Sequence, residues 1–498
     1  MTREDKNRII VLAIMFAIAG VLGITNGSYL ITAMYIITVI AAAFIIKEKD
    51  IYNLLYAVLL VSTFYDYVLY VPGIQSIYMF HIVLGIFTLL SLYKVFKDRS
   101  ILLSLDKKII GIYVIWFIYM SASVTWALNK SLSIKYIAIY LMMFAFILNL
   151  MIYNINKERI KKTVKLLLFL ISLITIIAFI EVVLGSQLPI RHYADAFMEY
   201  LPKLDQSLIN ARPMAFSFNP NNLAATIAIL CPLFFYTIYK SENIFVKVWC
   251  ILVSFADFAL IAITTSRTGF AAVAFGVGVY AVYSIFSFKS IGLKGLLYPM
   301  ILVIALFVSF NYSYMLMNVK ETNGQSKMKN GLADKVNALE DAEIQQGGEG
   351  SLNVRMTIIK DVLDGTLIQE KKYFGYGVGN VEQFIRNKAN TTGIYSPHCY
   401  AIEILGDFGV PGIILYGIYY LYLLISNIII GIRKKSLFCF AAASGLIAFA
   451  PASFGPSSIT YVFSYWILMG FAVSCIQVYK NENDDYRKTS SMKEYRGI

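Results

Sequence analysis

Charged residues are scarce in this sequence of 498 residues. Only 15% of the chain is Asp, Glu, Lys or Arg, whereas 58% is hydrophobic. A soluble globular protein has about a quarter of its residues charged and roughly 45–50% apolar. The scarcity of charge therefore argues against an ordinary soluble domain.

Cysteine and histidine are also few, with five and three residues. Cys231, Cys250, Cys439 and Cys475 lie in or against apolar blocks, and only Cys399 falls near a predicted outer loop. Their spacing fits neither a disulfide framework nor a metal site, and the outer segments hold no His/Cys cluster or Asp pair. We therefore expect a protein that uses no metal and no cofactor.

Long apolar blocks dominate the chain instead. They are about 17–25 residues long, as a membrane-crossing helix requires, whereas a large soluble core would give shorter periodic stretches. This pattern predicts an all-α, polytopic membrane bundle of about fourteen transmembrane helices. The predicted spans are 9–25, 29–46, 51–70, 74–96, 109–128, 132–153, 163–184, 219–240, 245–265, 269–288, 292–312, 398–427, 437–453 and 459–479.

The net charge of +13 would indicate a nucleic-acid partner in a soluble protein. Here the basic residues lie mostly in short loops between apolar blocks, where they orient the protein in the membrane, so we expect no nucleic acid. All of these loops fall on one side if both termini are cytoplasmic. The residues concerned are Lys47, Lys49, Lys94, Lys97, Arg99, Lys107, Lys108, Lys157, Arg159, Lys161, Lys162, Lys165, Lys240, Lys247, Lys289, Lys294, Arg433, Lys434 and Lys435.

The N-terminus carries Arg3, Lys6 and Arg8 before the first apolar block. A cleaved signal peptide is the alternative to a retained span. The block continues past Gly20 and Gly23 without a clear cleavage site, so we expect a retained first span.

Two predicted outer segments are long, at about 185–218 and 313–397. Loops of more than about 12–15 residues are usually functional or disordered. The chain is therefore divided into helices 1–11 within 1–312, a large extracytoplasmic loop at 313–397, helices 12–14 within 398–479, and a cytoplasmic tail at 480–498.

The two halves of the second loop differ in composition. The first half is rich in Asn, Gln and Gly at 323–324 and 345–348, and we expect it to be flexible. In the second half, Ser351 is a candidate N-cap of a helix with Arg355 in its first turn. The apolar face of this helix comprises Val354, Ile358 and Leu363, and a tight irregular stretch follows at Gly375, Gly377 and Gly379.

Three helices are predicted to begin on the outer side with a capping residue, at Asn219-Pro220, at Ser266 and at Ser396-Pro397. The free N–H groups and positive dipole end of such a terminus favour phosphate and other anions. Arg212 and Arg267 add guanidinium groups suited to a diphosphate. Alternatively, arginines at a membrane edge simply extend to the lipid headgroups.

Together, four motifs resemble the O-antigen ligase and polysaccharide polymerase superfamily. They are the segment 212–222, the pair Ser266-Arg267, Arg355 with the stretch 375–379, and the segment 398–412 that begins with His398. The resemblance covers about 110–470, whereas 1–100 matches only in hydropathy. Cys399 departs from the pattern, because a small polar residue is expected after the histidine.

The resemblance implies a metal-independent membrane glycosyltransferase. Such a protein moves a glycan from a polyprenyl diphosphate carrier, such as undecaprenyl diphosphate, to a glycan acceptor on the outer face of the bacterial plasma membrane. Carried over by position, His398 would engage the acceptor, and the diphosphate would bind Arg212, Arg267 and Arg355. Candidate supporting residues are Asn221, Ser266, Asp257 and Glu403. Membrane lipids, a flippase and a chain-length regulator are the further expected partners.

Other ionisable residues leave two interpretations open. Asp257 lies near the middle of the span 245–265, where an ionisable group is by default a functional hypothesis, and a buried hydrogen bond to a neighbouring helix is the alternative. Asp66 and His81 flank the Pro72-Gly73 turn, and we expect a structural pair. His192 rivals His398 as the acceptor-binding histidine, but no helix start is recognisable near it.

We expect a polymerase that joins lipid-linked oligosaccharide repeat units into a cell-surface polysaccharide. Ligation of a finished glycan to a lipid or protein acceptor is the alternative within the same family. A lipid-linked glycan flippase or transporter, or a scaffold protein, is the alternative from another class. Transporters usually place polar groups at the midplane of inverted repeats, whereas here no convincing repeat is found and the polar residues gather at the outer edge.

Overall fold

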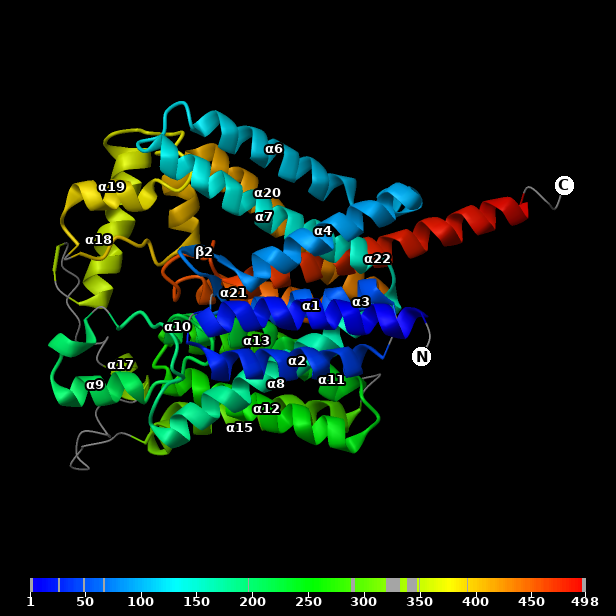
Figure 1. The fold of residues 1–498 in the computed structure, drawn as a ribbon, viewed down its shortest axis with the longest axis horizontal. Helices are drawn as coiled ribbons and strands as arrows, with labels where there is room; N and C mark the ends of the chain where they lie inside the picture. The colour runs from blue at the N-terminus through cyan, green and yellow to red at the C-terminus, as the bar shows by residue number, and fades with distance from the viewer. Residues whose placement is uncertain are drawn as a thin grey trace.

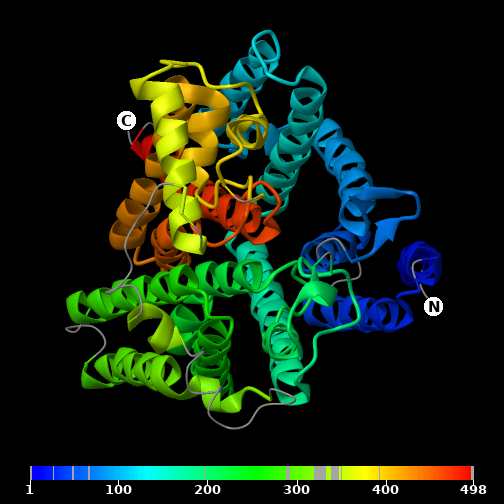
Figure 2. The same ribbon diagram turned by 90° about the vertical axis from the view of Figure 1, so that its left-hand side faces the viewer.

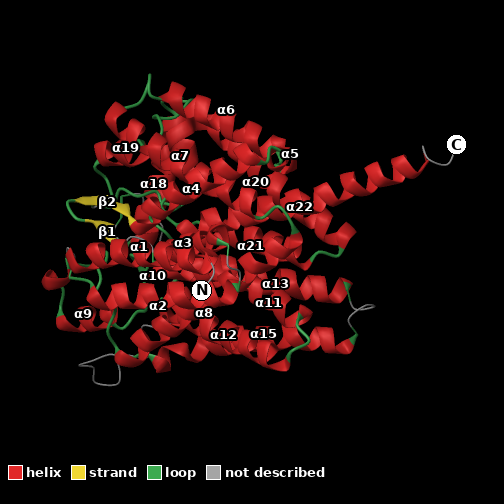
Figure 3. Cartoon of the chain, turned by 45° about the vertical axis from the view of Figure 1, so that its right-hand side comes forward, coloured by secondary structure: helices red, strands yellow, loops and turns green. Residues whose placement is uncertain are grey.

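A computed structural model describes residues 3–25, 27–47, 50–65, 68–195, 197–287, 292–318, 332–337, 347–348, 350–391 and 393–494. Helices make up most of this part of the chain (Figures 1 and 3). Within it, ten helices are long and apolar enough to cross a bilayer, and two shorter helices are also apolar. The predicted all-α membrane bundle is therefore confirmed.

The helices before the first long loop are α1 (Arg3–Thr25), α2 (Tyr29–Ile46), α3 (Ile51–Phe64), α4 (Met79–Lys97), α5 (Ser100–Ser104), α6 (Lys107–Ser123), α7 (Lys130–Tyr153) and α8 (Lys157–Leu184). The first long loop contains η1 (Met198–Tyr200) and α9 (Lys203–Asn210), and it leads to α10 (Pro220–Leu230), α11 (Pro232–Lys240), α12 (Ile244–Ile263), α13 (Arg267–Phe286) and α15 (Leu293–Tyr312). The second contains η2 (Ser313–Leu316), α17 (Leu332–Asn337), α18 (Ser351–Leu363), the π-helical η3 (Asp364–Ile368) and α19 (Val381–Lys388). The last helices are α20 (Tyr400–Lys434), α21 (Leu437–Ala452) and α22 (Phe463–Glu494).

The two ends of the bundle differ. Both termini lie at one end, and α9, α18 and α19 lie at the other, which we call the loop end (Figure 1). Because successive spans alternate in direction, the short basic loops that follow α2, α4 and α7 share the end that carries the termini. These short basic loops therefore lie together at one end of the bundle, as the sequence predicted.

Large apolar side chains cover the outside of the bundle. Phe44 of α2, Leu89 of α4, Phe275 of α13 and Ile304 of α15 are all exposed. Apolar surface of this extent on a helical bundle is suited to lipid, in which helices keep their backbone hydrogen bonds internal. Inside the bundle, buried tyrosines bond across helices to small hydroxyl groups, as Tyr56 does to Thr163 at 2.8 Å.

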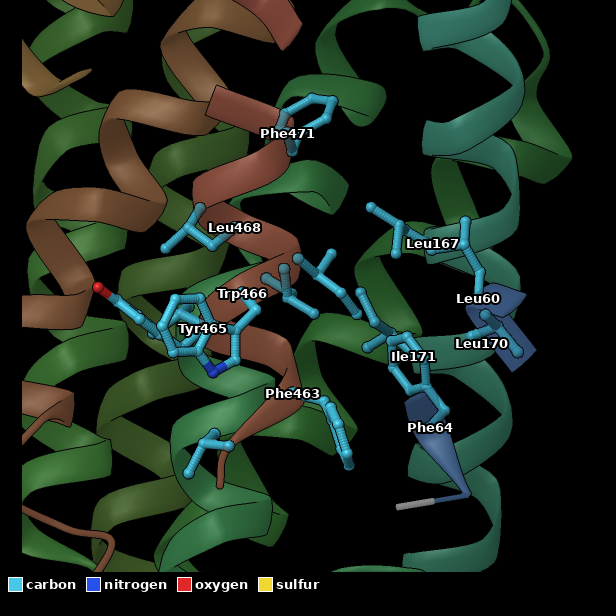
Figure 4. Close-up of a cluster of buried hydrophobic side chains, with 14 of the residues drawn as sticks. Leu60, Phe64, Leu167, Leu170, Ile171, Phe463, Tyr465, Trp466, Leu468 and Phe471 are labelled. Carbon is cyan, nitrogen blue, oxygen red and sulfur yellow. The ribbon is translucent and has the colours of Figure 1, made fainter. Parts of the chain in front are cut away.

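Helix α22 occupies the centre of the bundle and packs against α7, α20, α21 and α10 (Figure 2). Figure 4 shows Phe463, Trp466 and Phe471 of α22 in a buried cluster with residues of α3 and α8. This packing joins the C-terminal part of the chain to its N-terminal helices.

Three predicted spans differ from the structure. The span 51–70 ends early because α3 stops at Phe64, and the first residues of the span 74–96 form the hairpin of β1 (Tyr70–Val71) and β2 (Ile74–Tyr78). Gly73 at the turn has a φ of +77°, which favours glycine. The span 219–240 is still one membrane-length stretch, Pro220–Lys240, but it is interrupted between α10 and α11, where Pro232 begins the second helix because proline has no N–H to donate to a continuous helix.

Candidate active site

A cleft of about 1040 Å³ lies among the loops at the loop end of the bundle. Its walls come from the segment before α10, the junction of α12 and α13, the start of α18, helix α19 and the residues that precede α20. Of the eight candidate catalytic, diphosphate-binding and supporting residues predicted from the sequence, six line this cleft, and Asp257 and Glu403 do not. The six are Arg212, Asn221, Ser266, Arg267, Arg355 and His398.

The segment that carries Arg212 is held by a carboxylate that sequence reasoning missed. Glu181, in the last turn of α8, accepts hydrogen bonds from the backbone N–H groups of Leu188, Met214 and Ala215 at 2.7–2.8 Å. The sequence did contain a signal for Glu181, because an ionisable residue inside a predicted membrane span, here 163–184, is by default a functional candidate.

Arg212 presents a cation with unused hydrogen-bonding capacity. Within the described structure its Nε atom is buried and has no hydrogen-bond partner. Burial lowers the pKa of Arg212, and the Tyr193 hydroxyl opposes this shift. An anion in the cleft would relieve both the desolvation of the charge and the missing hydrogen bond.

Two of the three predicted helix starts are confirmed. The Asn219 side chain accepts the N–H of Asn222 at 2.9 Å, with Pro220 as the first residue of α10. The Ser266 side chain accepts the N–H of Gly269 at 3.3 Å, which makes Arg267 the first residue of α13. Both N-termini contribute to the cleft, so their dipoles add to the positive potential there.

Arg355 approaches the same region from the large loop. Helix α18 begins at Ser351 after Gly350, so the predicted cap at Ser351 is one residue out of register. Val354 and Ile358 are buried as predicted, which directs Arg355 toward the cleft. Its Nη1 atom donates to the carbonyl of Phe454 at 3.1 Å, and burial together with the nearby charge of Arg267 lowers its pKa.

The predicted helix start at His398 is wrong. Helix α20 begins at Tyr400, its N-cap Cys399 makes no side-chain capping bond, and Ser396 and Pro397 lie outside the helix. His398 itself has a φ of +50°, and its N–H donates to the carbonyl of Ser457 at 3.3 Å. Contacts with the segment before α22, which no local pattern reveals, therefore determine the backbone of His398.

The ring of His398 also contacts that segment. Its Nδ1 atom lies 3.3 Å from the carbonyl oxygen of Gly455, and an acceptor there favours the tautomer that carries a proton on Nδ1. Nε2 then keeps its lone pair. Burial, with the nearby charge of Arg355, lowers the pKa of His398 to about 4.

Glu403 does not line the cleft, although it supports it. Its buried carboxylate accepts hydrogen bonds from Ser458 Oγ at 2.5 Å, from Thr460 Oγ1 at 3.1 Å and from the N–H of Ile459 at 3.3 Å. These bonds fix the segment whose carbonyl groups hold His398. Glu403 is thus a positioning residue.

The glycine-rich stretch is organised in a similar way. Gly375, Gly377 and Gly379 all have positive φ, which confirms the predicted tight conformation. The buried carboxylate of Asp407 accepts the N–H of Gly379 at 2.7 Å and of Val381, the first residue of α19, at 2.8 Å. Asp407 therefore orients α19, which carries Glu382 and Arg386 into the cleft.

Three other polar residues do not line the cleft. Asp257 is fully buried and its Oδ1 atom accepts the hydroxyl of Thr175 on α8 at 2.6 Å, which is the helix-to-helix bond considered as its alternative role. The rival histidine, His192, is buried, and its N–H donates to Asp195. Asp66 lies outside the described residues, and the Nδ1 atom of His81 accepts the N–H of Tyr78 at 2.9 Å.

The cleft is strongly cationic. Among its described lining residues are four arginines and a single carboxylate, that of Glu382. In the described part of the chain, Arg212, Arg267 and Arg355 form no ion pair with a carboxylate, unlike Lys388, which pairs with Glu370 at 2.8 Å. Three cations kept close together without acidic partners are suited to a polyanion such as a diphosphate.

The fold and the cleft define a polytopic membrane protein with a cationic site at one end of its helices. A profile of the O-antigen ligase family matches residues 250–417, a range that contains Arg267, Arg355 and His398. The chain is also 24% identical over 480 residues to the teichuronic acid biosynthesis protein TuaE of Bacillus subtilis (strain 168), covering 93% of this chain and 90% of that protein. Both similarities support the resemblance to the O-antigen ligase and polysaccharide polymerase superfamily that the sequence motifs indicate.

Proposed function

We propose that this protein polymerises lipid-linked oligosaccharide repeat units into a cell-surface polysaccharide. The donor would be a glycan on a polyprenyl diphosphate, and the site would face the outside of the plasma membrane. One observation carries the proposal: three arginines that have no carboxylate partner among the described residues share a cleft with a neutral histidine. The similarity to a teichuronic acid biosynthesis protein supports a role in polysaccharide assembly.

The arginines would bind the diphosphate and stabilise it as the leaving group. When the bond between the anomeric carbon and the diphosphate oxygen breaks, its electron pair leaves with the polyprenyl diphosphate. Fixed cations and helix N-termini lower the energy of that developing charge without a proton donor. The N-termini of α10 and α13, with Arg212 and Arg267 beside them, provide both.

His398 would accept the proton of the attacking hydroxyl group. The acceptor oxygen forms its bond to the anomeric carbon while its proton passes to Nε2. Nδ1 faces the carbonyl oxygen of Gly455, so Nε2 is the nitrogen left to act as a base. Burial and Arg355 keep the ring neutral at physiological pH.

Ligation of a finished glycan is the second candidate, favoured by the match to the O-antigen ligase family. It uses the same donor and the same bond changes, and it differs only in the acceptor. The product separates the two functions: a ladder of chain lengths supports polymerisation, whereas single transfer to a different lipid or protein supports ligation.

The test uses purified protein in lipid nanodiscs with lipid-linked repeat units. Arg267→Ala and Arg212→Ala should abolish transfer, and Arg267→Lys should be impaired but active, because lysine keeps the charge and loses the bidentate geometry. Arg433→Ala, which changes an arginine in the last turn of α20 at the opposite end, is the matched control and should be normal. Normal transfer by both cleft variants at unchanged protein levels would exclude the assignment.

A further inference from the structure

A second cavity, of about 890 Å³, adjoins the cationic cleft. It lies between the β1–β2 hairpin, the first turn of α4, the first half of α7 and the residues that precede α22. Phe218, Asn219, Glu382 and Ser457 line both spaces. The two cavities are therefore adjacent and share one wall.

The second cavity extends into the apolar part of the bundle. Ile139, Met142 and Met143 line its deeper part, and α7 begins at Lys130. At 1.5 Å per residue, Met142 lies about 18 Å along the helix from that start, well within the length that a bilayer covers. The other end of the cavity is lined by Ile74 and Ile77 of the hairpin, which are exposed. Such walls suit a hydrocarbon chain.

Positive charge lines the cavity near the hairpin end. Lys135 of α7, which is exposed, and Arg191, in the first long loop, both contribute to its lining. Burial raises the pKa of the Glu382 carboxyl, and the nearby charges of Arg386 and Lys135 oppose that shift. Two cations, a carboxylate on the shared wall and an apolar part thus line one cavity.

We propose that this second cavity binds the acceptor substrate as a polyprenyl diphosphate-linked glycan. The inference rests on the proposed polymerase function, and it specifies a second diphosphate site at Lys135 and Arg191. The carrier chain would lie along Ile139 and Met142, and the acceptor glycan would reach the shared wall. Glu382 would accept hydrogen bonds from sugar hydroxyl groups there and so hold the acceptor toward His398.

The geometry of the reaction favours two separate sites. Transfer requires the acceptor oxygen to approach the anomeric carbon while the donor diphosphate occupies its own site, so a second binding place for the acceptor's carrier would keep the two diphosphates apart. A ligase that used a non-diphosphate acceptor would need only the arginine cleft. The number of diphosphate sites is therefore a property that distinguishes polymerisation.

The experiment measures how many undecaprenyl diphosphate molecules bind to each chain, by equilibrium binding of labelled lipid to protein in phosphatidylcholine nanodiscs. The wild-type protein should bind two. The double variant Lys135→Ala/Arg191→Ala should keep one site and weaken the other about 10–100-fold, the loss expected for charge-assisted hydrogen bonds. Arg212→Ala/Arg267→Ala should keep the complementary site. Lys130→Ala, which changes an exposed lysine of the same helix as Lys135, should still bind two molecules of the labelled lipid.

A cavity-filling variant provides a second measurement if the double variant folds poorly. Ile139→Trp should displace the second lipid while Lys135→Arg retains it, with thermal denaturation and size-exclusion profiles as folding controls. Two outcomes would overturn the acceptor site and leave the donor cleft intact. In the first, Lys135→Ala/Arg191→Ala still binds two lipids. In the second, the wild-type protein binds one lipid, and only Arg212→Ala/Arg267→Ala removes it. The proposed function would be overturned together with the acceptor site if the wild-type protein bound no lipid. The same would hold if it bound one lipid that only Lys135→Ala/Arg191→Ala removed.

Discussion

At the scale of single residues, the protonation of His398 is governed by its surroundings and not by a helix terminus. A helix beginning at Ser396-Pro397, as the sequence predicted, would have placed its dipole at the ring, yet His398 precedes α20. Burial has the largest effect on its pKa, followed by the charge of Arg355, and together they lower it to about 4. A neutral base is available at any pH above that value.

This environment predicts an unusual pH dependence. Transfer should stay constant as the pH falls from 8 to 6, where an ordinary histidine with a pKa of about 6.5 would begin to lose its basic form. The rate should fall only as the pH approaches about 4. Arg355→Ala removes the repelling charge, raises the pKa of His398 and moves the acid limb of the residual activity to higher pH. A pH–rate profile of both proteins tests this, and an unchanged acid limb in the variant would contradict it.

His398→Gln tests the base directly. Glutamine can donate or accept a hydrogen bond but cannot take up the proton, so turnover should fall by about 10²–10⁴-fold while the affinity for the donor is kept. Single-turnover transfer and donor binding are the two measurements. Near-normal turnover would eliminate the base role, and loss of donor binding would instead place His398 at the diphosphate.

At the scale of elements, the kink of α20 connects the membrane helix to the large loop. Gly409 has a φ of +65° inside the helix, and the N–H of Val410 donates to the carbonyl of Tyr373 at 2.8 Å. The first part of α20 thereby packs against the glycine-rich stretch, while the second part continues as a membrane span. Asp407 and Glu403 lie in that first part and hold α19 and the segment around Ser457.

Gly409→Ala should therefore destabilise the protein. A Cβ atom at this position would lie 2.0 Å from the carbonyl oxygen of Tyr373, and the backbone conformation itself costs a non-glycine residue about 1–3 kcal/mol. We expect a lower melting temperature and a lower transfer rate. Gly417→Ala is the matched control in the same helix, because nothing lies within 4 Å of its added Cβ atom. Equal melting temperatures of the two variants would refute the role of the kink.

At the scale of the whole molecule, orientation in the membrane follows from the charge at the two ends of the bundle. The basic loops lie at the end of the termini, and the cleft lies at the loop end. From the positive-inside tendency we expect the cleft to face the outside of the cell.

Tags report this orientation. Tags near Lys161 and Arg433 should be cytoplasmic, and tags near Asp205 and Gln345 should be outside. A pair of reporters, one active only in the cytoplasm and one only outside, measures each position. Asp205 and Gln345 on opposite sides would disprove both the topology and the proposed site.

How much the sequence determined depends on the range of the interaction concerned. Hydropathy, the caps at Asn219 and Ser266 and the three glycines with positive φ are local properties, because they depend on a residue and its near neighbours in the chain. The membrane helices and the gathering of arginines toward one end could therefore be predicted from the amino acids alone.

Tertiary structure decided what the cleft contains and what surrounds it. His398 takes its conformation from Ser457 and Gly455, residues far along the chain, and Glu181 and Glu403 support segments that they do not adjoin in sequence. Buried carboxylates find their partners only when helices pack, because backbone N–H groups from distant loops are brought to them at that stage. The wall shared by the two cavities arises in the same way, since the segments that form it meet only in the folded bundle.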